Sequence, residues 1–143
     1  MNISERIESA KGFYLGDICY VLGSNLYYGV WGKEYRYSEG VFEDPETALK
    51  VAVAHTEYGD GRYQGSDGTK FPVDAGVIGL VPLELVKKES GLEDGRVIEV
   101  PGTALFEAED GQFKITAPSG EIITIDTSYD CDYWDDDGED ENE

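Results

Sequence analysis

HTEYGDGRYQGSDGTKFPVDAGVIGLVP, residues 55–82, decides the fold because it joins two glycine-rich turns to an apolar strand. The first turn, at 58–61, and the Asp67-Gly68 pair, a strong hairpin signal, enclose a short strand at 62–64. Residues 69–73 then predict the returning strand. The apolar run VIGLV at 77–81 is typical of a buried strand. This stretch therefore predicts a β-hairpin that leads directly into a core strand.

The chain before this stretch alternates apolar runs with short breaks. Residues 13–15, 18–22 and 48–55 predict strands because they are rich in β-branched and aromatic side chains. Residues 1–11 predict a brief helical turn after Ser4, whose hydroxyl suits a helix cap.

Residues 24–37 combine a cap at Ser24 with aromatic residues spaced four apart: Tyr27, Trp31 and Tyr35. That spacing places them on one face of a helix, so we expect a helix with an aromatic stripe packed in the core. Residues 38–47 predict a polar loop.

The chain after residue 82 begins with PLELVKKE, which predicts a helix at 82–89 that ends at Gly91. Proline suits a first helical turn and lysines suit the last one. Four short strands then follow at 97–100, 103–108, 112–116 and 121–126, separated by Pro-Gly, Asp-Gly and Ser-Gly turns. The predicted fold class is α+β: mostly antiparallel β, as a curled sheet or small open barrel, with one or two short helices.

Charge divides the chain into two parts. The 143 residues include 11 basic and 31 acidic side chains, for a net charge of −20. Ten acids and no base follow from Asp126 to the end, and the other 21 acids and 11 bases lie in residues 1–125, so each part carries −10. We expect one globular domain over 1–126 and an acidic, largely disordered tail over 127–143, because like charges repel and nothing apolar follows residue 134.

Composition narrows the classes of function. A charge this negative repels the phosphate backbone and attracts basic surfaces, so direct nucleic-acid binding is disfavoured and a basic protein is the expected partner. With no run of 18 apolar residues and no basic, apolar leader at Met1, we expect a cytoplasmic protein that binds no membrane. Cys19 and Cys131 lie outside any C-x-x-C spacing; two reduced thiols, with Cys19 buried, are favoured over a bridge between them.

Three motifs carry a resemblance to known proteins. Residues 12–22 read GFYLGDICYVL, residues 56–63 read TEYGDGRY, and residues 73–82 read VDAGVIGLVP. Together, over about residues 12–86, they resemble a family of small uncharacterised proteins from bacteria and their phages. The chain departs from the family pattern at Ile18, where proline commonly follows the aspartate. The resemblance implies a bacterial or phage source and supplies no catalytic residues.

Three aspartates are candidates for chemistry. Asp17 and Asp60 lie beside glycine and Asp74 lies two residues before Gly76, all at turns, and carboxylates brought together in a fold can share a proton or hold a cation. The favoured alternative is that each caps a turn through backbone N–H groups. His55, the one histidine, has no G-x-S-x-G elbow for a nucleophile. Since EF-hand and P-loop spacings are also absent, we expect neither a metal nor a cofactor.

Two hypotheses for function follow. The first is a non-enzymatic acidic interaction protein, of phage or bacterial origin, that binds and inhibits a basic, nucleic-acid-handling host protein; the rival explanation of the acidity is solubility alone. Its contacts would be tail residues: Tyr129, Asp130, Asp132, Tyr133, Trp134, Asp135, Asp136 and Asp137. The alternative is a small-ligand or metal-binding domain, or a small hydrolase. Its pocket would contain Asp17, Tyr20, Tyr58, Asp60, Tyr63 and Asp74. A non-enzymatic role is favoured over an enzymatic one.

Overall fold

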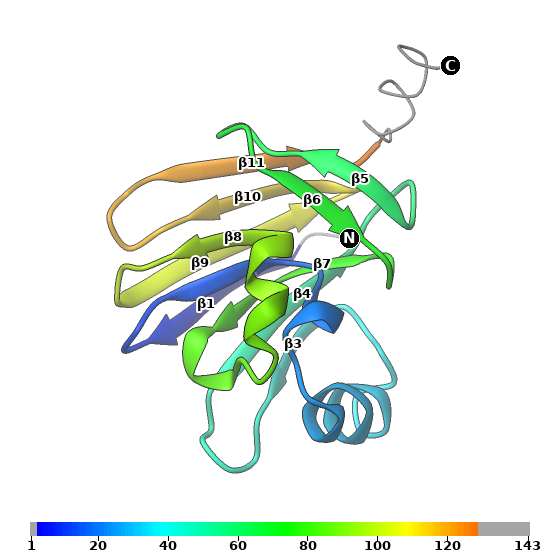
Figure 1. The fold of residues 1–143 in the computed structure, drawn as a ribbon, viewed down its shortest axis with the longest axis vertical. Helices are drawn as coiled ribbons and strands as arrows, with labels where there is room; N and C mark the ends of the chain where they lie inside the picture. Colours follow the sequence, from blue (N-terminus) through cyan, green and yellow to red (C-terminus); the bar gives the residue numbers. More distant parts are fainter. Residues whose placement is uncertain (1–2, 129–143) are drawn as a thin grey trace.

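Two antiparallel sheets and a hairpin form the molecule in the computed structural model, which describes residues 3–128 (Figure 1). One sheet has the strand order β1 (Ile3–Ser9), β9 (Gly102–Glu109), β10 (Gln112–Thr116) and β11 (Ile122–Asp126). The other has the order β3 (Gly40–Glu43), β4 (Lys50–His55), β7 (Val77–Pro82), β2 (Phe13–Gly16) and β8 (Gly95–Ile98). The hairpin pairs β5 (Gly61–Gln64) with β6 (Lys70–Val73), and a bridge between Gly65 and Ile125 joins it to β11. The predicted α+β class is confirmed, and the sheets do not close into a barrel.

The five-stranded sheet is buried on both faces. Its inner face packs against the four-stranded sheet and the hairpin in one core, built on large side chains such as Phe13, Leu80, Phe106 and Phe113. Its outer face carries a second cluster, which includes Val51, Val53, Val81 and Trp31. Strands β4 and β7 therefore read as nearly continuous apolar runs, because neither face of them meets water.

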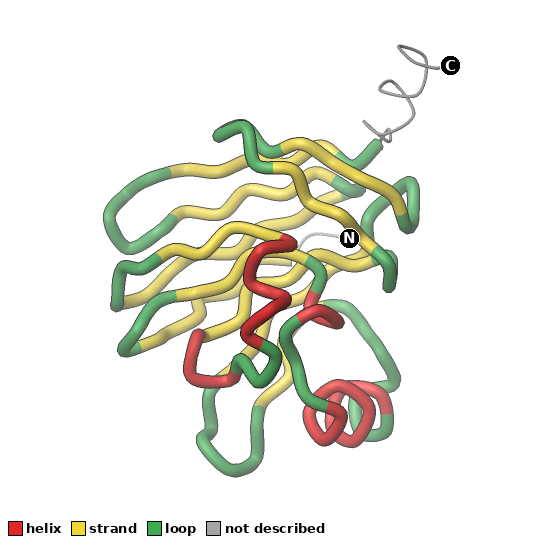
Figure 2. Tube along the Cα trace, viewed as in Figure 1, coloured by secondary structure: helices red, strands yellow, loops and turns green. Residues whose placement is uncertain are grey.

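Short helices cover the outer face of that sheet (Figure 2). They are the 3₁₀ turns η1 (Ile18–Tyr20), η3 (Leu83–Leu85) and η4 (Glu89–Asp94), and the π-helix η2 (Asn25–Gly32). The π geometry shows in i→i+5 bonds, such as that from the Lys33 N–H to the Tyr28 carbonyl oxygen at 2.9 Å. The predicted helix at 24–37 is thus present in part, and its Trp31 is buried as expected. The loop predicted at 38–47 contains the edge strand β3.

Two predictions for the N-terminal part are wrong. Residues 1–11 contain strand β1 rather than a helical turn. Ile3 and Ile7, four residues apart, would share one face of either a helix or a strand, and pairing with β9 selects the strand. Residues 18–22 contain the 3₁₀ turn η1 rather than a strand. There the Asp17 carboxylate accepts a hydrogen bond from the Cys19 N–H at 3.0 Å and so starts a turn of helix.

Two predictions after β7 are also wrong. The helix at 82–89 shrinks to the single turn η3, because Val86 is extended and the Lys87 and Lys88 N–H groups both donate to the Val21 carbonyl oxygen. Gly91 lies within η4 instead of ending a helix. The strand predicted at 97–100 forms as β8 but pairs with β2, so the C-terminal meander has three strands, not four.

The C-terminal end of the described chain belongs to the body. Thr127 is fully buried beyond β11, and β11 lies beside the β5–β6 hairpin (Figure 1). The tail contacts predicted at 129–137 lie outside the described residues. Within 3–128, the structure contains no helix with the length and apolar character needed to cross a membrane.

Candidate functional site

An acidic cavity of about 240 Å³ lies where three loops and strand ends meet. The segments that line it come from distant parts of the chain, and three of them bring carboxylates: Glu39, Glu57, and the pair Glu109 and Asp110. Among the described residues, no lysine or arginine lines it. The cavity therefore presents a concentrated negative potential to solvent.

Thr127 ties the end of the described chain to the rim of this cavity. Its backbone N–H donates to the Gly111 carbonyl oxygen at 2.9 Å, and its hydroxyl donates to the same oxygen at 2.6 Å. In return, the Thr127 hydroxyl oxygen accepts a hydrogen bond from the Glu57 N–H at 3.0 Å, and its carbonyl oxygen accepts one from the Tyr58 N–H at 3.1 Å. Ser128 therefore follows directly from the rim.

Gly111 makes this junction sterically possible. Its φ is +80°, a left-handed value that favours glycine, in the tight turn between β9 and β10. A Cβ at this position would lie 2.5 Å from the Glu57 Cβ and 2.8 Å from the Thr127 Oγ1. Only glycine lets the three segments approach so closely.

His55 contributes to the cavity through Glu39. The Glu39 carboxylate accepts a hydrogen bond from the His55 backbone N–H at 2.7 Å and lies 3.3 Å from its imidazole Nδ1. The Cys19 thiol, which could serve as a nucleophile beside a histidine, lines a different cavity. The structure thus gives His55 an electrostatic partner and does not place it in one cavity with that thiol.

The predicted pocket residues fall into two groups. Asp17, Tyr20 and Asp74 come together: Asp17 is fully buried and its Oδ2 accepts hydrogen bonds from the Asp74 and Ala75 N–H groups, both at 2.7 Å. The hydroxyl of Tyr20 hydrogen-bonds the Asp74 carboxylate. Asp17 therefore joins the turn before β7 to the turn after β2, in the capping role favoured for it from sequence.

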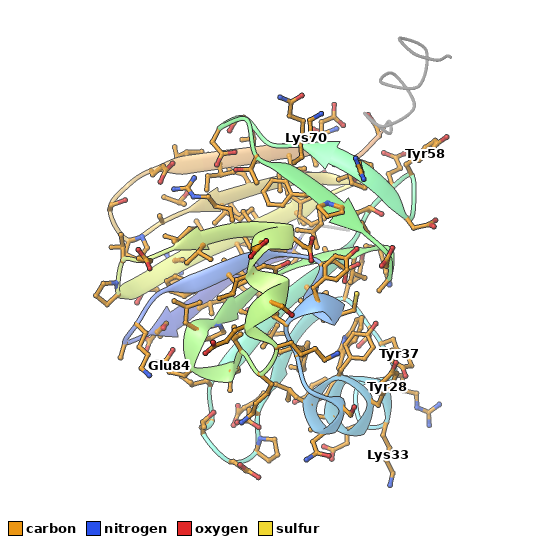
Figure 3. The ribbon with its side chains drawn as sticks, viewed as in Figure 1. Tyr28, Lys33, Tyr37, Tyr58, Lys70 and Glu84 are labelled. Atoms are coloured by element: carbon orange, nitrogen blue, oxygen red, sulfur yellow. The ribbon has the colours of Figure 1, made fainter. Side chains whose placement is uncertain are left out.

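The other group lies around the turn before β5. The Tyr63 ring is buried and its hydroxyl donates to the Gly59 carbonyl oxygen at 2.5 Å, whereas Tyr58 is 56% exposed and points to solvent (Figure 3). Asp60 precedes Gly61, which pairs with Val73, so Asp60 and Asp74 flank the same end of the hairpin as exposed side chains. Within residues 3–128, no three histidine, cysteine or carboxylate side chains are arranged to hold a metal ion.

Burial changes the acidity of the groups around Asp17. Burial, followed by the negative charge of Asp17, raises the pKa of the half-buried Cys19 thiol to about 12. Burial, followed by the hydrogen bond to Asp74, raises the pKa of the Tyr20 hydroxyl. Both groups stay protonated at neutral pH, so the thiol is a poor nucleophile.

The residues that sequence reasoning missed are the carboxylates around the acidic cavity and their anchor, Thr127. The sequence predicts only a turn at Glu109-Asp110-Gly111, and it singles out Glu57 only as part of the motif at 56–63. The comparisons with known proteins give no relative: neither a family model, nor a curated protein, nor a solved structure matches the chain. The resemblance to bacterial and phage proteins therefore stays a prediction.

Proposed function

We propose that the protein is a non-enzymatic binding protein that captures a basic protein at the acidic cavity and the tail that leaves from its rim. One observation carries this proposal: Thr127 is held between Glu57 and Gly111, so the tail begins beside the cavity carboxylates. Residues 129–143 add nine acids and no base. The acidic tail is therefore continuous in sequence with the rim of the acidic cavity.

A basic, nucleic-acid-handling protein fits this surface best. The partner's lysine and arginine side chains, which otherwise bind nucleic-acid phosphates, would pair with the carboxylates of the acidic cavity and the tail. The partner would be inhibited because its nucleic-acid-binding face is then occupied. Charge complementarity of this kind mainly raises the association rate, and salt screens it over about 10 Å at 0.1 M. The proposal thus requires binding that weakens steeply with salt.

Capture from a bacterial lysate tests the proposal. The full chain and a chain that ends at Ser128 are immobilised, and bound proteins are eluted with a salt gradient. Truncation at 128 is preferable to truncation at 126, because removal of Thr127 would also break the junction with Glu57 and Gly111. We expect a basic protein to bind the full chain and to elute from the shortened chain at lower salt.

Two results would contradict the proposal. One is that neither chain retains a basic protein at low salt. The other is that the captured protein elutes from both chains at the same salt concentration, which would leave the tail without a part in binding.

A further inference from the structure

A second cavity, of about 300 Å³, lies between η1, η2 and the turn before β7. The residues that line it are Cys19, Leu22, Ser24, Tyr27, Tyr28, Asp74, Ala75 and Lys88. None of them lines the acidic cavity. Its volume is at the small end of the range for pockets that bind organic ligands.

Two opposite charges face this cavity. The Asp74 carboxylate is exposed, is hydrogen-bonded by the Tyr20 hydroxyl, and takes part in no ion pair recorded within residues 3–128. Lys88 supplies the positive charge, and its backbone is held by the N–H bond to the Val21 carbonyl oxygen at 3.1 Å. Asp74 and Lys88 therefore bring opposite charges to the lining of one cavity, together with Cys19.

Two tyrosine rings form its aromatic wall. The Tyr27 and Tyr28 rings lie 4.8 Å apart between centroids and are nearly perpendicular, at 83°. Tyr27 also packs edge-on against Trp31, with centroids 5.3 Å apart, which holds it in place. Tyr28 is 61% exposed and projects outward from η2 (Figure 3). Such rings attract an ammonium group and also pack against an apolar side chain.

Two hydrogen bonds hold the backbone at Asp74 in place. Its backbone N–H and that of Ala75 donate to the buried Asp17 carboxylate, both at 2.7 Å. The buried carboxylate thus holds the backbone from which the Asp74 side chain lines the cavity. Preorganisation of this kind lowers the entropy lost on binding.

We propose that this cavity binds a free α-amino acid with an apolar side chain. The ammonium group lies between the Asp74 carboxylate and the tyrosine rings, the carboxylate pairs with Lys88, and the side chain packs on Tyr27, Tyr28 and Leu22. A simple anion would meet Asp74 and a net charge of −20, and a simple cation would meet Lys88. A zwitterion satisfies both charges at once.

L-Phenylalanine is the probe, with two blocked analogues. N-Acetylphenylalanine lacks the ammonium group and phenylalaninamide lacks the carboxylate. Binding to the full chain is followed by chemical shifts of backbone amides, with the thermal midpoint as a second readout at about 10 mM probe. We expect phenylalanine to shift the amides of residues 19–28 and 74–75, and each analogue to bind about tenfold more weakly.

Variants locate the site. Asp74→Asn and Lys88→Gln should each weaken phenylalanine binding about tenfold. Lys87→Gln is the matched control, because Lys87 is the adjacent lysine but lines another cavity. All three positions are exposed, and unchanged melting without probe confirms that the variants fold.

Three results would overturn the inference: no amide shift with phenylalanine, equal binding of an analogue and phenylalanine, or equal affinity of Asp74→Asn and the unaltered chain. Because the two cavities share no lining residue, failure here leaves the acidic surface untouched, and loss of partner capture leaves this site untouched.

Discussion

Replacement of Asp17 by alanine should destabilise the protein more than any other single change of an aspartate within residues 3–128. The carboxylate is completely buried and accepts three backbone hydrogen bonds, from Cys19 at 3.0 Å and from Asp74 and Ala75 at 2.7 Å. These bonds tie the turn after β2 to the turn before β7. Alanine would leave all three N–H donors without their acceptor.

The size of the effect follows from these three bonds. A hydrogen bond to a charged group contributes about 1.5–3 kcal/mol to stability, and an abandoned buried donor costs about 1–3 kcal/mol. Because the three N–H groups are only partly buried, water replaces some of the lost bonding, and we expect a loss of about 3 kcal/mol. Asp17→Asn keeps one acceptor oxygen but turns an NH₂ group toward an N–H donor, so its loss should be about 1–2 kcal/mol.

Urea unfolding followed by far-UV circular dichroism measures this loss. With a typical slope of about 1–3 kcal/mol/M, Asp17→Ala should lower the midpoint by roughly 1–3 M and Asp17→Asn by about half as much. Asp60→Asn is the control, because Asp60 is an exposed turn aspartate and should change the free energy of unfolding by less than about 0.5 kcal/mol. Equal midpoints for Asp17→Ala and Asp60→Asn would refute the reasoning.

Three further predictions concern other parts of the chain. In the same unfolding assay, Gly111→Ala should lower the free energy of unfolding by about 2 kcal/mol more than Gly120→Ala. Both glycines have positive φ, but only at Gly111 would a Cβ clash, with Glu57 and Thr127. Equal losses of stability would contradict the packed junction. Stability should fall as pH rises from about 9 toward 12, because burial raises the pKa of Cys19 and of Tyr27 to about 12, so the unfolded chain releases these protons first; a flat profile would contradict it. Burial alone would raise the pKa of Asp67, but hydrogen bonds from Thr69 and Arg96 lower it overall. The ionised Asp67 carboxylate therefore stabilises the fold above the ordinary aspartate pKa, and this stabilisation is lost as pH falls through the lowered pKa. Arg96→Gln should therefore lose less stability than the unaltered chain between about pH 6 and 3, and an identical loss would argue against the ion pair.

The elements that could be predicted from sequence are those that local signals specify. The Asp67-Gly68 pair and the apolar run of β7 gave the central hairpin and its core strand. Residues 103–126 alternate apolar and polar side chains between glycine turns, and β9, β10 and β11 follow that pattern closely. Turn chemistry and period-two alternation act over a few residues, so no knowledge of distant partners was needed.

The errors arose where distant contacts decide the structure. Ile3 and Ile7 fit a helix and a strand equally well, and only the partner β9 distinguishes the two. Residues 82–89 have a good helical composition, yet the Val21 carbonyl oxygen draws both lysine N–H groups away from a helix. Likewise, β8 follows the same turn signals as its neighbours but pairs with β2, about 80 positions earlier in the chain.

The candidate sites show the same division. A turn-capping role for Asp17 followed from its neighbouring glycine, and the structure shows it with three N–H partners. The cavity carboxylates were missed because Glu57 and Gly111, the neighbour of Asp110, come together around Thr127, which is 70 positions from Glu57. No local sequence pattern predicts a contact between segments so far apart in the chain.

The most direct test of the acidic binding surface compares charge-matched variants by titration calorimetry with the captured partner at low salt. Glu57→Gln with Asp110→Asn removes two cavity charges, and Glu93→Gln with Glu99→Gln removes two exposed charges elsewhere. We predict that the cavity pair weakens binding about tenfold and the control pair less than about threefold. Equal weakening by both pairs would show that net charge alone attracts the partner, and would contradict a binding surface at the cavity.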